Sequence, residues 1–153
     1  MMPVPALVTP VHRLCVATAA MRYHEPVWLL YGILATEGTR PGQVVRDANG
    51  SYDMGPMGIN SIWLPVLARL GIRRVDVLDD GCQNVAVGAW ILARNLRGHQ
   101  VPQRAFAHPR AFWRHVGDYN SATPHWNHLY RQRVALAAQQ QYFAPLEDLH
   151  GDH

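Results

Sequence analysis

Glu37 is the residue of this sequence best placed for acid–base chemistry. It ends a strongly apolar stretch, PVWLLYGILATEG at residues 26–38, and stands directly before a glycine. A glutamate at the C-terminus of a helix opposes the helix dipole, so helix propensity does not explain its position. Apolar surroundings raise the pKa of a glutamate from about 4.3 towards about 6, which makes the carboxyl a general acid near neutral pH. The simpler alternative is a surface glutamate that ends a helix, and without other evidence this interpretation of Glu37 is favoured.

A second unusual segment is DMGPMGIN, at residues 53–60, which combines methionine, glycine and proline in a short window. Glycine lets a backbone approach another group closely, and methionine offers flexible apolar surface. A linker exposed to solvent would be polar instead. The composition therefore predicts a stiff loop whose backbone lies close to something flat and partly apolar.

Other kinds of site have less support. His125 and His128 are three residues apart on a predicted helix, but no HExxH motif accompanies them, so surface histidines are favoured over a metal site. The basic residues number 14, all of them arginine, and the formal net charge is +3. Because the arginines are scattered along the chain, we expect a solvated surface rather than a nucleic-acid interface.

The two cysteines, Cys15 and Cys82, lack the CxxC spacing typical of metal and redox sites. Two buried thiols and a disulfide are about equally supported, and a disulfide would stabilise the fold by about 2–4 kcal/mol in an oxidising compartment. The N-terminal segment has no clear apolar stretch behind a basic region, so an export signal is not evident. We expect residues 1–8 to be flexible, and Thr9 with Pro10 to begin the first helix.

The elements that must position these side chains are predicted to be helices, because apolar residues recur with helical spacing and strand-like alternation is almost absent. Residues 39–51 carry turn-forming residues instead. We expect helices around Cys15, at residues 26–38 and 61–70, from about 79 to 100, on both sides of an interruption near Pro109, and from about 123 to 143.

The whole chain is predicted to form one all-α domain at residues 9–143, followed by a frayed tail at residues 144–153. Its 153 residues, of which 48% are hydrophobic, are enough for a single core. No run of about 18 or more apolar residues occurs, so we expect no membrane-spanning helix.

Four segments, taken in order, carry a family resemblance. They are EGT at residues 37–39, NGSYDMGPMGINS at 49–61, CQNVAVGAW at 82–90 and YNSATPHWNHLYRQRV at 119–134. Together they resemble the soluble-type lytic transglycosylases of glycoside hydrolase family 23, especially the small members associated with type IV secretion, conjugation and pilus assembly. The resemblance extends from Cys15 to about Val134. It implies a lysozyme-like α-helical fold with a cleft for the glycan strand of peptidoglycan.

The resemblance also implies a reaction with Glu37 as its single catalytic acid. Glu37 would protonate the glycosidic oxygen between N-acetylmuramic acid and N-acetylglucosamine, while the muramoyl acetamido group replaces the second carboxylate of ordinary glycosidases. Glu37 would then act as the base that takes the proton of the C6 hydroxyl, which leaves a 1,6-anhydromuramic end. This chemistry requires no cofactor.

Substrate contacts are implied mainly for the methionine- and glycine-rich loop. In the family this loop lines the cleft beside the catalytic glutamate, so Gly55 and Gly58 are expected to bring backbone groups close to the sugars. Met57 is expected to supply apolar contact. Asn60 matches an asparagine of the motif, although capping a helix that begins at Ser61 is an equally good use of its side chain.

Two further contacts are implied near the end of the chain. Tyr119 matches a tyrosine that points into the site, and Asn120 follows it in the same motif. For Asn120, a structural role in the turn before the last helix is favoured over a substrate contact. Asp53 could face the cleft, but an Asx-type turn with Gly50 and Ser51 is favoured. For Trp63, Trp113 and Trp126, positions in the core are favoured over the cleft.

The resemblance further pairs Cys15 with Cys82 in a disulfide, which favours the periplasm or the cell envelope. It implies partners among the components of an envelope-spanning secretion, conjugation or pilus machine, and we expect a monomer. Two positions depart from the family pattern: Gly58 replaces a glutamine that contacts substrate, and Gly38 replaces a serine. The lost side chain makes a catalytically weak or inactive peptidoglycan-binding assembly module one alternative. A hydrolytic goose-type lysozyme, which shares the fold and the single glutamate, is the other.

Overall fold

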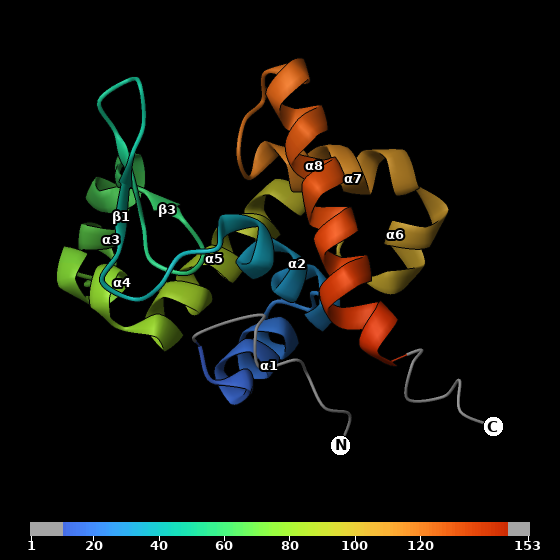
Figure 1. Cartoon of the computed structure of the whole chain (residues 1–153), viewed down its shortest axis with the longest axis horizontal. Helices are drawn as coiled ribbons and strands as arrows, with labels where there is room; N and C mark the ends of the chain where they lie inside the picture. Colours follow the sequence, from blue (N-terminus) through green and yellow to red (C-terminus); the bar gives the residue numbers. More distant parts are fainter. Residues whose placement is uncertain (1–10, 147–153) are drawn as a thin grey trace.

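Helix α2 (Val27–Glu37) lies at the centre of the fold (Figure 1). The computed structural model describes residues 11–146. In α2 the six residues from Leu29 to Leu34 are all buried, so the helix has no solvated face along this stretch. It ends at Gly38, which adopts a left-handed conformation with φ 65°. Glu37 is therefore the last residue of a buried helix.

The other helices are α1 (Arg13–Arg22), α3 (Leu64–Arg69), α4 (Arg74–Asp79), α5 (Gly81–Leu96), α6 (Pro102–Ala107), α7 (Pro109–Asp118) and α8 (Pro124–Ala138). Helices α1 and α8 pack against α2, whereas α3 and α4 lie on the side of the strands (Figure 1). A 3₁₀ turn, η1 (Ser61–Trp63), precedes α3, and a π-helical segment, η2 (Gln139–Phe143), continues α8. The predominance of helix confirms the predicted fold class.

A small antiparallel sheet is the feature that the sequence did not predict. It consists of β1 (Val44–Arg46), β2 (Tyr52–Met54) and β3 (Ile59–Asn60), in the order β1-β2-β3. These strands are two or three residues long, too short to show an alternating pattern. The sheet pairs Asp53 with Asn60, and it builds one side of the site described below.

Several predicted helix boundaries differ from the observed ones. The helix expected at residues 61–70 is a 3₁₀ turn followed by α3, and α4 had not been expected. The predicted interruption near Pro109 is present, since α6 ends at Ala107 and α7 begins at Pro109. Residues 144–146, assigned to the tail, are helical. The first helix begins at Arg13 with His12 as its N-cap, so the start expected at Thr9 and Pro10 is wrong. The segment at 1–8 and residues 147–153 lie outside the described residues.

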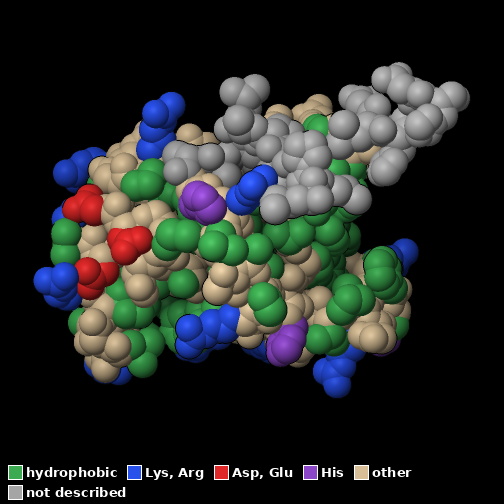
Figure 2. Space-filling model, turned by 90° about the horizontal axis from the view of Figure 1, so that it is seen from below, with side chains coloured by type: hydrophobic (Ala, Val, Ile, Leu, Met, Phe, Trp, Pro, Cys, Tyr) green, Lys and Arg blue, Asp and Glu red, His purple; other side chains and the backbone are tan. Residues whose placement is uncertain are grey.

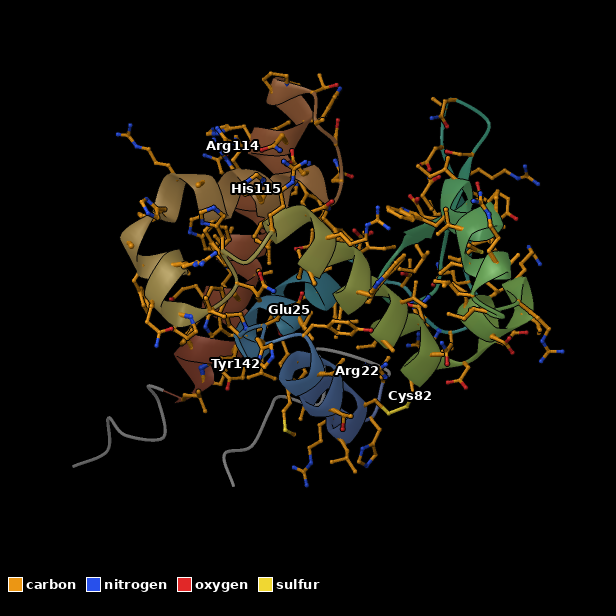
Figure 3. The ribbon with its side chains drawn as sticks, turned by 180° about the vertical axis from the view of Figure 1, so that it is seen from behind. Arg22, Glu25, Cys82, Arg114, His115 and Tyr142 are labelled. Carbon is orange, nitrogen blue, oxygen red and sulfur yellow. A yellow bond between two sulfur atoms is a disulfide. The ribbon has the colours of Figure 1, made fainter. Side chains whose placement is uncertain are left out.

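A disulfide joins Cys15 to Cys82 and confirms the predicted pairing. It links α1 to the first turn of α5, and Figure 3 shows the sulfur–sulfur bond beside Cys82. The two residues are 67 positions apart. By restricting the unfolded chain, a cross-link over a loop of this length contributes about 4 kcal/mol to stability.

The arginines form no continuous patch on the face of the molecule that Figure 2 shows. On this face, seen from below, the arginine side chains are spread among apolar and polar groups. Among the described residues, no helix is both long enough and apolar enough to cross a membrane.

Glu25, between α1 and α2, is the main polar exception inside the domain (Figure 3). Its side chain is 6% exposed, and neither carboxyl oxygen has a hydrogen-bond partner among the described residues. Burial raises the pKa of Glu25 from 4.5 to about 9. The carboxyl is therefore neutral at pH 7, because an unpaired buried charge would cost more than proton uptake.

This buried acid predicts a specific pH dependence of stability. The folded-state pKa of Glu25 lies above its unfolded value, so its favourable contribution is complete below about pH 4.5 and is lost as the pH rises towards about 9. Between these values each pH unit costs about 1.4 kcal/mol. We expect Glu25→Gln to lack this loss, and so to gain about 4 kcal/mol relative to the wild type as the pH rises from 5 to 8. Urea unfolding at both pH values measures it, and parallel pH curves would contradict it.

Candidate active site

A cleft of about 630 Å³ opens between the sheet and the junction of α7 and α8. One wall comes from residues between Asp47 and Trp63, and the other from residues 118–122 with Trp126. Ile91 and Asn95 of α5 contribute to it as well. In Figure 1 the two walls stand on opposite sides of α5. This volume is in the range of sites for small or extended ligands.

Glu37 lines this cleft, as predicted, from the C-terminus of α2. Its side chain is half-buried, and its Oε1 atom accepts a hydrogen bond of 2.9 Å from the Tyr130 hydroxyl. Burial raises the pKa of Glu37 to about 7, assisted by the negative charges of Asp53 and Asp47 and opposed by the Tyr130 hydrogen bond. Near neutral pH this carboxyl is therefore close to half-protonated, which suits a group that both donates and accepts a proton.

Tyr130 is the residue of this site that the sequence analysis did not assign a role. It is buried on α8, and its ring stacks on that of Tyr119 with centroids 6.3 Å apart. It stands in the quoted motif at residues 119–134, four positions before Val134 and therefore on the same face of α8. That spacing was the available signal, but a buried helical tyrosine is also typical of a core.

Tyr119 lines the cleft, as expected, and has a structural contact as well. Its hydroxyl donates a 2.7 Å hydrogen bond to the Met57 carbonyl. The junction of α7 and α8 is thereby attached to the methionine-rich loop on the other side of the site.

The expected sugar contact of the Met57 side chain is wrong. That side chain is fully buried and packs against α5, where a Cβ atom on Gly88 would lie 2.7 Å from it. Gly55 likewise does not line the cleft. The space where a Gly55 side chain would lie is filled by the amide of Asn84. Both residues hold the loop on its core side, because the apolar side of the loop faces the core and not the cleft.

Asn84 holds this loop with its buried amide. Its Oδ1 atom accepts a 2.8 Å hydrogen bond from the Met57 N–H, and its Nδ2 donates 2.9 Å bonds to the carbonyls of Met54 and Val77. The side chain is fully buried, so these bonds are made without competition from water. The loop backbone is therefore fixed in position beside Glu37.

Gly58 does line the cleft, and it lies directly against the catalytic candidate. A Cβ atom at this position would overlap the carboxyl group of Glu37. The residue also has φ 59°, a conformation that side-chain-bearing residues rarely adopt. At the position where the family resemblance would place a glutamine, this chain thus leaves space that the Glu37 carboxyl occupies.

Asn60 has the capping role that the sequence allowed, and it lies at the cleft. Its Oδ1 accepts a 3.0 Å hydrogen bond from the Ile62 N–H, which caps η1. Its Nδ2 lies 2.9–3.0 Å from side-chain oxygens of Asp47, Ser51 and Asp53. Asn60 therefore organises the acidic wall of the cleft, which it also lines.

The Asx turn favoured for Asp53 is wrong. Asp53 belongs to strand β2 and lines the cleft, while Asn49 makes the turn by accepting a 3.0 Å hydrogen bond from the Ser51 N–H. Burial raises the pKa of Asp53, with the Asn60 hydrogen bond acting against it. The wall thus places further carboxyl groups in the cleft that holds Glu37.

Asn120 is exposed on the other wall and lines the cleft. Its N–H donates a 3.0 Å hydrogen bond to the Gly117 carbonyl, so it also shapes the turn after α7.

The histidines and tryptophans are placed as follows. Among residues 11–146, no group of three metal-binding side chains could hold an ion, and the His128 ring lies 3.0 Å from the Arg131 guanidinium. Trp113 packs against Trp28 in an aromatic cluster, as favoured. Trp63 lines the cleft and also packs against the core, so the core contact favoured for it is present. Trp126 lines the cleft and is 56% exposed, so the core position favoured for it is wrong.

Comparison with known proteins gives a partial match. The chain is similar to the "Invasion protein IagB" of Salmonella typhimurium, with 32% identity over 115 residues, and to the protein of the same name from Salmonella typhi, with 33% identity. The match covers 74% of this chain and 66% of the length of each of these relatives. No protein-family model matches the sequence.

The contact between Gly58 and Glu37 predicts the effect of adding one methyl group. We expect Gly58→Ala to displace the Glu37 carboxyl and to destabilise the fold by at least about 2 kcal/mol. Gly71→Ala is the matched control, because Gly71 also has a positive φ of 79° but nothing within 4 Å of its side-chain position. It should cost only about 1–2 kcal/mol of backbone strain. Equal losses in chemical denaturation, with an unchanged Glu37 pKa, would contradict the assignment.

The hydrogen bond from Tyr130 gives a second prediction. Because its hydroxyl donates to Glu37 and favours the charged carboxylate, we expect Tyr130→Phe to raise the Glu37 pKa above about 7. NMR titration of the glutamate side-chain carboxyls measures it. Tyr119→Phe is the control, since the Tyr119 hydroxyl donates to a backbone carbonyl and not to Glu37. A Glu37 pKa that stays constant or falls in Tyr130→Phe would show that the bond does not control the titration.

Proposed function

We propose that this chain is a lytic transglycosylase of glycoside hydrolase family 23, acting on the bond between N-acetylmuramic acid and N-acetylglucosamine in peptidoglycan. The observation that carries the proposal is Glu37, a half-buried carboxyl in a cleft with a pKa raised to about 7. It stands at the position where the family resemblance requires the catalytic acid. The surrounding motif residues Gly58, Tyr119 and Asn60 line the same cleft.

In the proposed reaction, protonated Glu37 gives its proton to the glycosidic oxygen as the bond to the muramic C1 breaks. The acetamido oxygen of the same sugar attacks C1, so the substrate supplies the nucleophile. Glu37, now a carboxylate, takes the proton of the C6 hydroxyl while the C6 oxygen forms a bond to C1 and the acetamido group leaves. The proton returns to Glu37, water is not consumed, and the product is a 1,6-anhydro end.

Tyr130 and Gly58 support both halves of this cycle. The Tyr130 hydroxyl stabilises the carboxylate form that acts as the base. Gly58 leaves space for the carboxyl group, whose partial burial favours the neutral form that acts as the acid. The two effects oppose each other, and the pKa of about 7 is their balance.

Hydrolysis is the second candidate, and the acidic wall favours it. Asp47 and Asp53 line the cleft together with Glu37. In glycosidases a second carboxylate activates water or stabilises positive charge at C1. A goose-type lysozyme reaction would then give reducing ends in place of anhydro ends.

The cellular setting belongs to the same proposal. The disulfide between Cys15 and Cys82 suits an oxidising compartment, which supports the periplasm or the cell envelope. The similarity to proteins named for invasion supports a role in local opening of the wall for an envelope-spanning apparatus. Its components would be the protein partners.

Digestion of purified peptidoglycan sacculi tests the proposal. We expect the wild type to release muropeptides with 1,6-anhydro ends, at a rate that falls above about pH 7 as Glu37 loses its proton. Glu37→Gln should reduce the rate by about 10²–10⁴-fold. Glu25→Gln is the matched control, because it makes the same change in a buried glutamate that does not line the cleft. It should retain activity. Mass spectrometry reads the products.

Each other outcome selects a different function. Reducing ends that depend on Glu37 would replace the transglycosylase with a lysozyme. Intact sacculi that sediment with the protein would leave a peptidoglycan-binding module, in which the absence of a side chain at Gly58 has removed activity. Equal rates for Glu37→Gln and Glu25→Gln would refute the catalytic assignment.

A further inference from the structure

Trp126 has a side chain that the fold itself does not use. It lies in the first turn of α8, 56% of its surface is exposed, and it lines the cleft. Its ring contacts that of the neighbouring His125, with centroids 4.7 Å apart. Single exposed apolar residues are common on proteins, but this one stands at the rim of the cavity that holds Glu37. Its ring is therefore available to a ligand in the cleft.

The backbone next to Trp126 is held rigidly. Asn127 is buried, and its Nδ2 donates hydrogen bonds of 2.9 Å to the Arg114 carbonyl and to Asp118 Oδ1. The His115 Nδ1 atom lies 3.2 Å from Asp118 Oδ2, and both Arg114 and His115 belong to α7 (Figure 3). Gly117 leaves the space that the Asn127 side chain fills. The start of α8 is thereby fixed to the end of α7, and a ligand stacking on Trp126 would not have to order its backbone.

The opposite wall offers a second apolar group at the same cleft. Ile62 is 69% exposed and lines the cavity from η1, where Asn60 caps the turn through the Ile62 N–H. Trp126 and Ile62 thus belong to different walls, and both keep apolar surface in water. A ligand with an apolar face can bury part of this surface when it enters.

The charges of the cleft indicate what kind of ligand this is. Its lining includes the carboxyl groups of Glu37, Asp47, Asp53 and Asp118. Among the described residues, no Arg, Lys or His lines the cleft. An anionic ligand would face several like charges without a compensating cation. Amide and hydroxyl groups are supplied by Asn95, Asn120 and Ser121, which match the hydrogen-bonding groups of an uncharged N-acetylated sugar.

We propose that Trp126 is a stacking platform for a neutral N-acetylhexosamine ring of the glycan strand, a subsite that rests on the proposed function of this cleft. The equatorial substituents of a β-linked pyranose leave a flat face of C–H groups, and this face covers the indole. Uncharged N-acetylglucosamine fits the acidic lining better than a muramic residue with a free carboxylate. The platform sets the affinity for the strand and takes no part in proton transfer.

The test uses the neutral tetramer of N-acetylglucosamine and isothermal titration calorimetry. We expect Trp126→Ala to weaken binding by about tenfold or more, because the truncation removes the apolar face that the sugar ring covers. Trp126→Phe should recover most of the affinity. Phe106→Ala is the control, because Phe106 is 82% exposed on α6 and does not line the cleft. The tetramer should also shift the tryptophan fluorescence of the wild type to the blue, and this shift should be smaller in Trp126→Phe, in which Trp63 is the tryptophan that still lines the cleft.

A second measurement separates this inference from the proposed function. On sacculi, Trp126→Ala should raise the substrate concentration needed for half-maximal rate while changing the maximal rate little. Suppose that the wild type cleaves sacculi and that Trp126→Ala has the same half-saturation, tetramer affinity and thermal unfolding as the wild type. This result would refute the platform and leave the proposed function unaffected. A wild type that neither binds the tetramer nor cleaves sacculi would overturn both. Binding of an apolar peptide at Trp126 in place of the tetramer would assign the rim to a protein partner and also refute the platform.

Discussion

The fixed loop beside Glu37 is the constraint on which the candidate site depends. Buried Asn84 holds the backbone of this loop from inside the domain, and the Met57 side chain fills the space above Gly88. Three other elements then attach to the same loop: Thr39, just after α2, donates to the Gly55 carbonyl, Tyr119 donates to the Met57 carbonyl, and the Glu37 carboxyl lies against Gly58. The motifs at 37–39, 49–61, 82–90 and 119–134 therefore meet at one short stretch of backbone. Loss of the Asn84 amide would leave buried loop groups unpaired and would loosen all of these attachments together.

Burial alone does not explain why Glu37 is the better candidate for proton transfer. Glu25 is more deeply buried, and its pKa is raised further, to about 9. It has no hydrogen-bond partner among the described residues and does not line the cleft, so it remains neutral and has no ligand to protonate. In Glu37 the same desolvation is opposed by the Tyr130 hydroxyl, which brings the pKa down to about 7. Both protonation states are then accessible near neutral pH, and the carboxyl opens onto a cavity.

The sequence predicted those features that a helical pattern or an ordered motif expresses. The buried helix ending at Glu37, the interruption at Pro109 and the mostly helical fold follow from apolar spacing and turn residues. The disulfide could be assigned only through the family resemblance, since spacing alone left both thiol states open. The sheet was missed because its strands are too short to alternate, and Met57 was misplaced because a loop has no periodicity that tells inward from outward side chains. The hydrogen bond of Tyr130 joins residues 93 positions apart, a contact that only the folded chain brings together.

Under the proposed function, Gly58 also explains why the cleft would bind its substrate through groups away from the carboxyl. A side chain at this position would compete with Glu37 for the same space, so the chain gains room for the acid and has no side-chain donor there. The nearby loop groups are mostly engaged: the Gly58 N–H bonds to the Gly55 carbonyl, and the Met57 carbonyl accepts from Tyr119. Affinity for a long ligand then has to come from the two walls, where Asn120, Ile62 and Trp126 remain exposed. This arrangement, with a rigid centre and a rim that provides most of the contact area, suits a polymer. Several units of the strand can then bind at the rim and supply the binding energy that the one reacting unit requires.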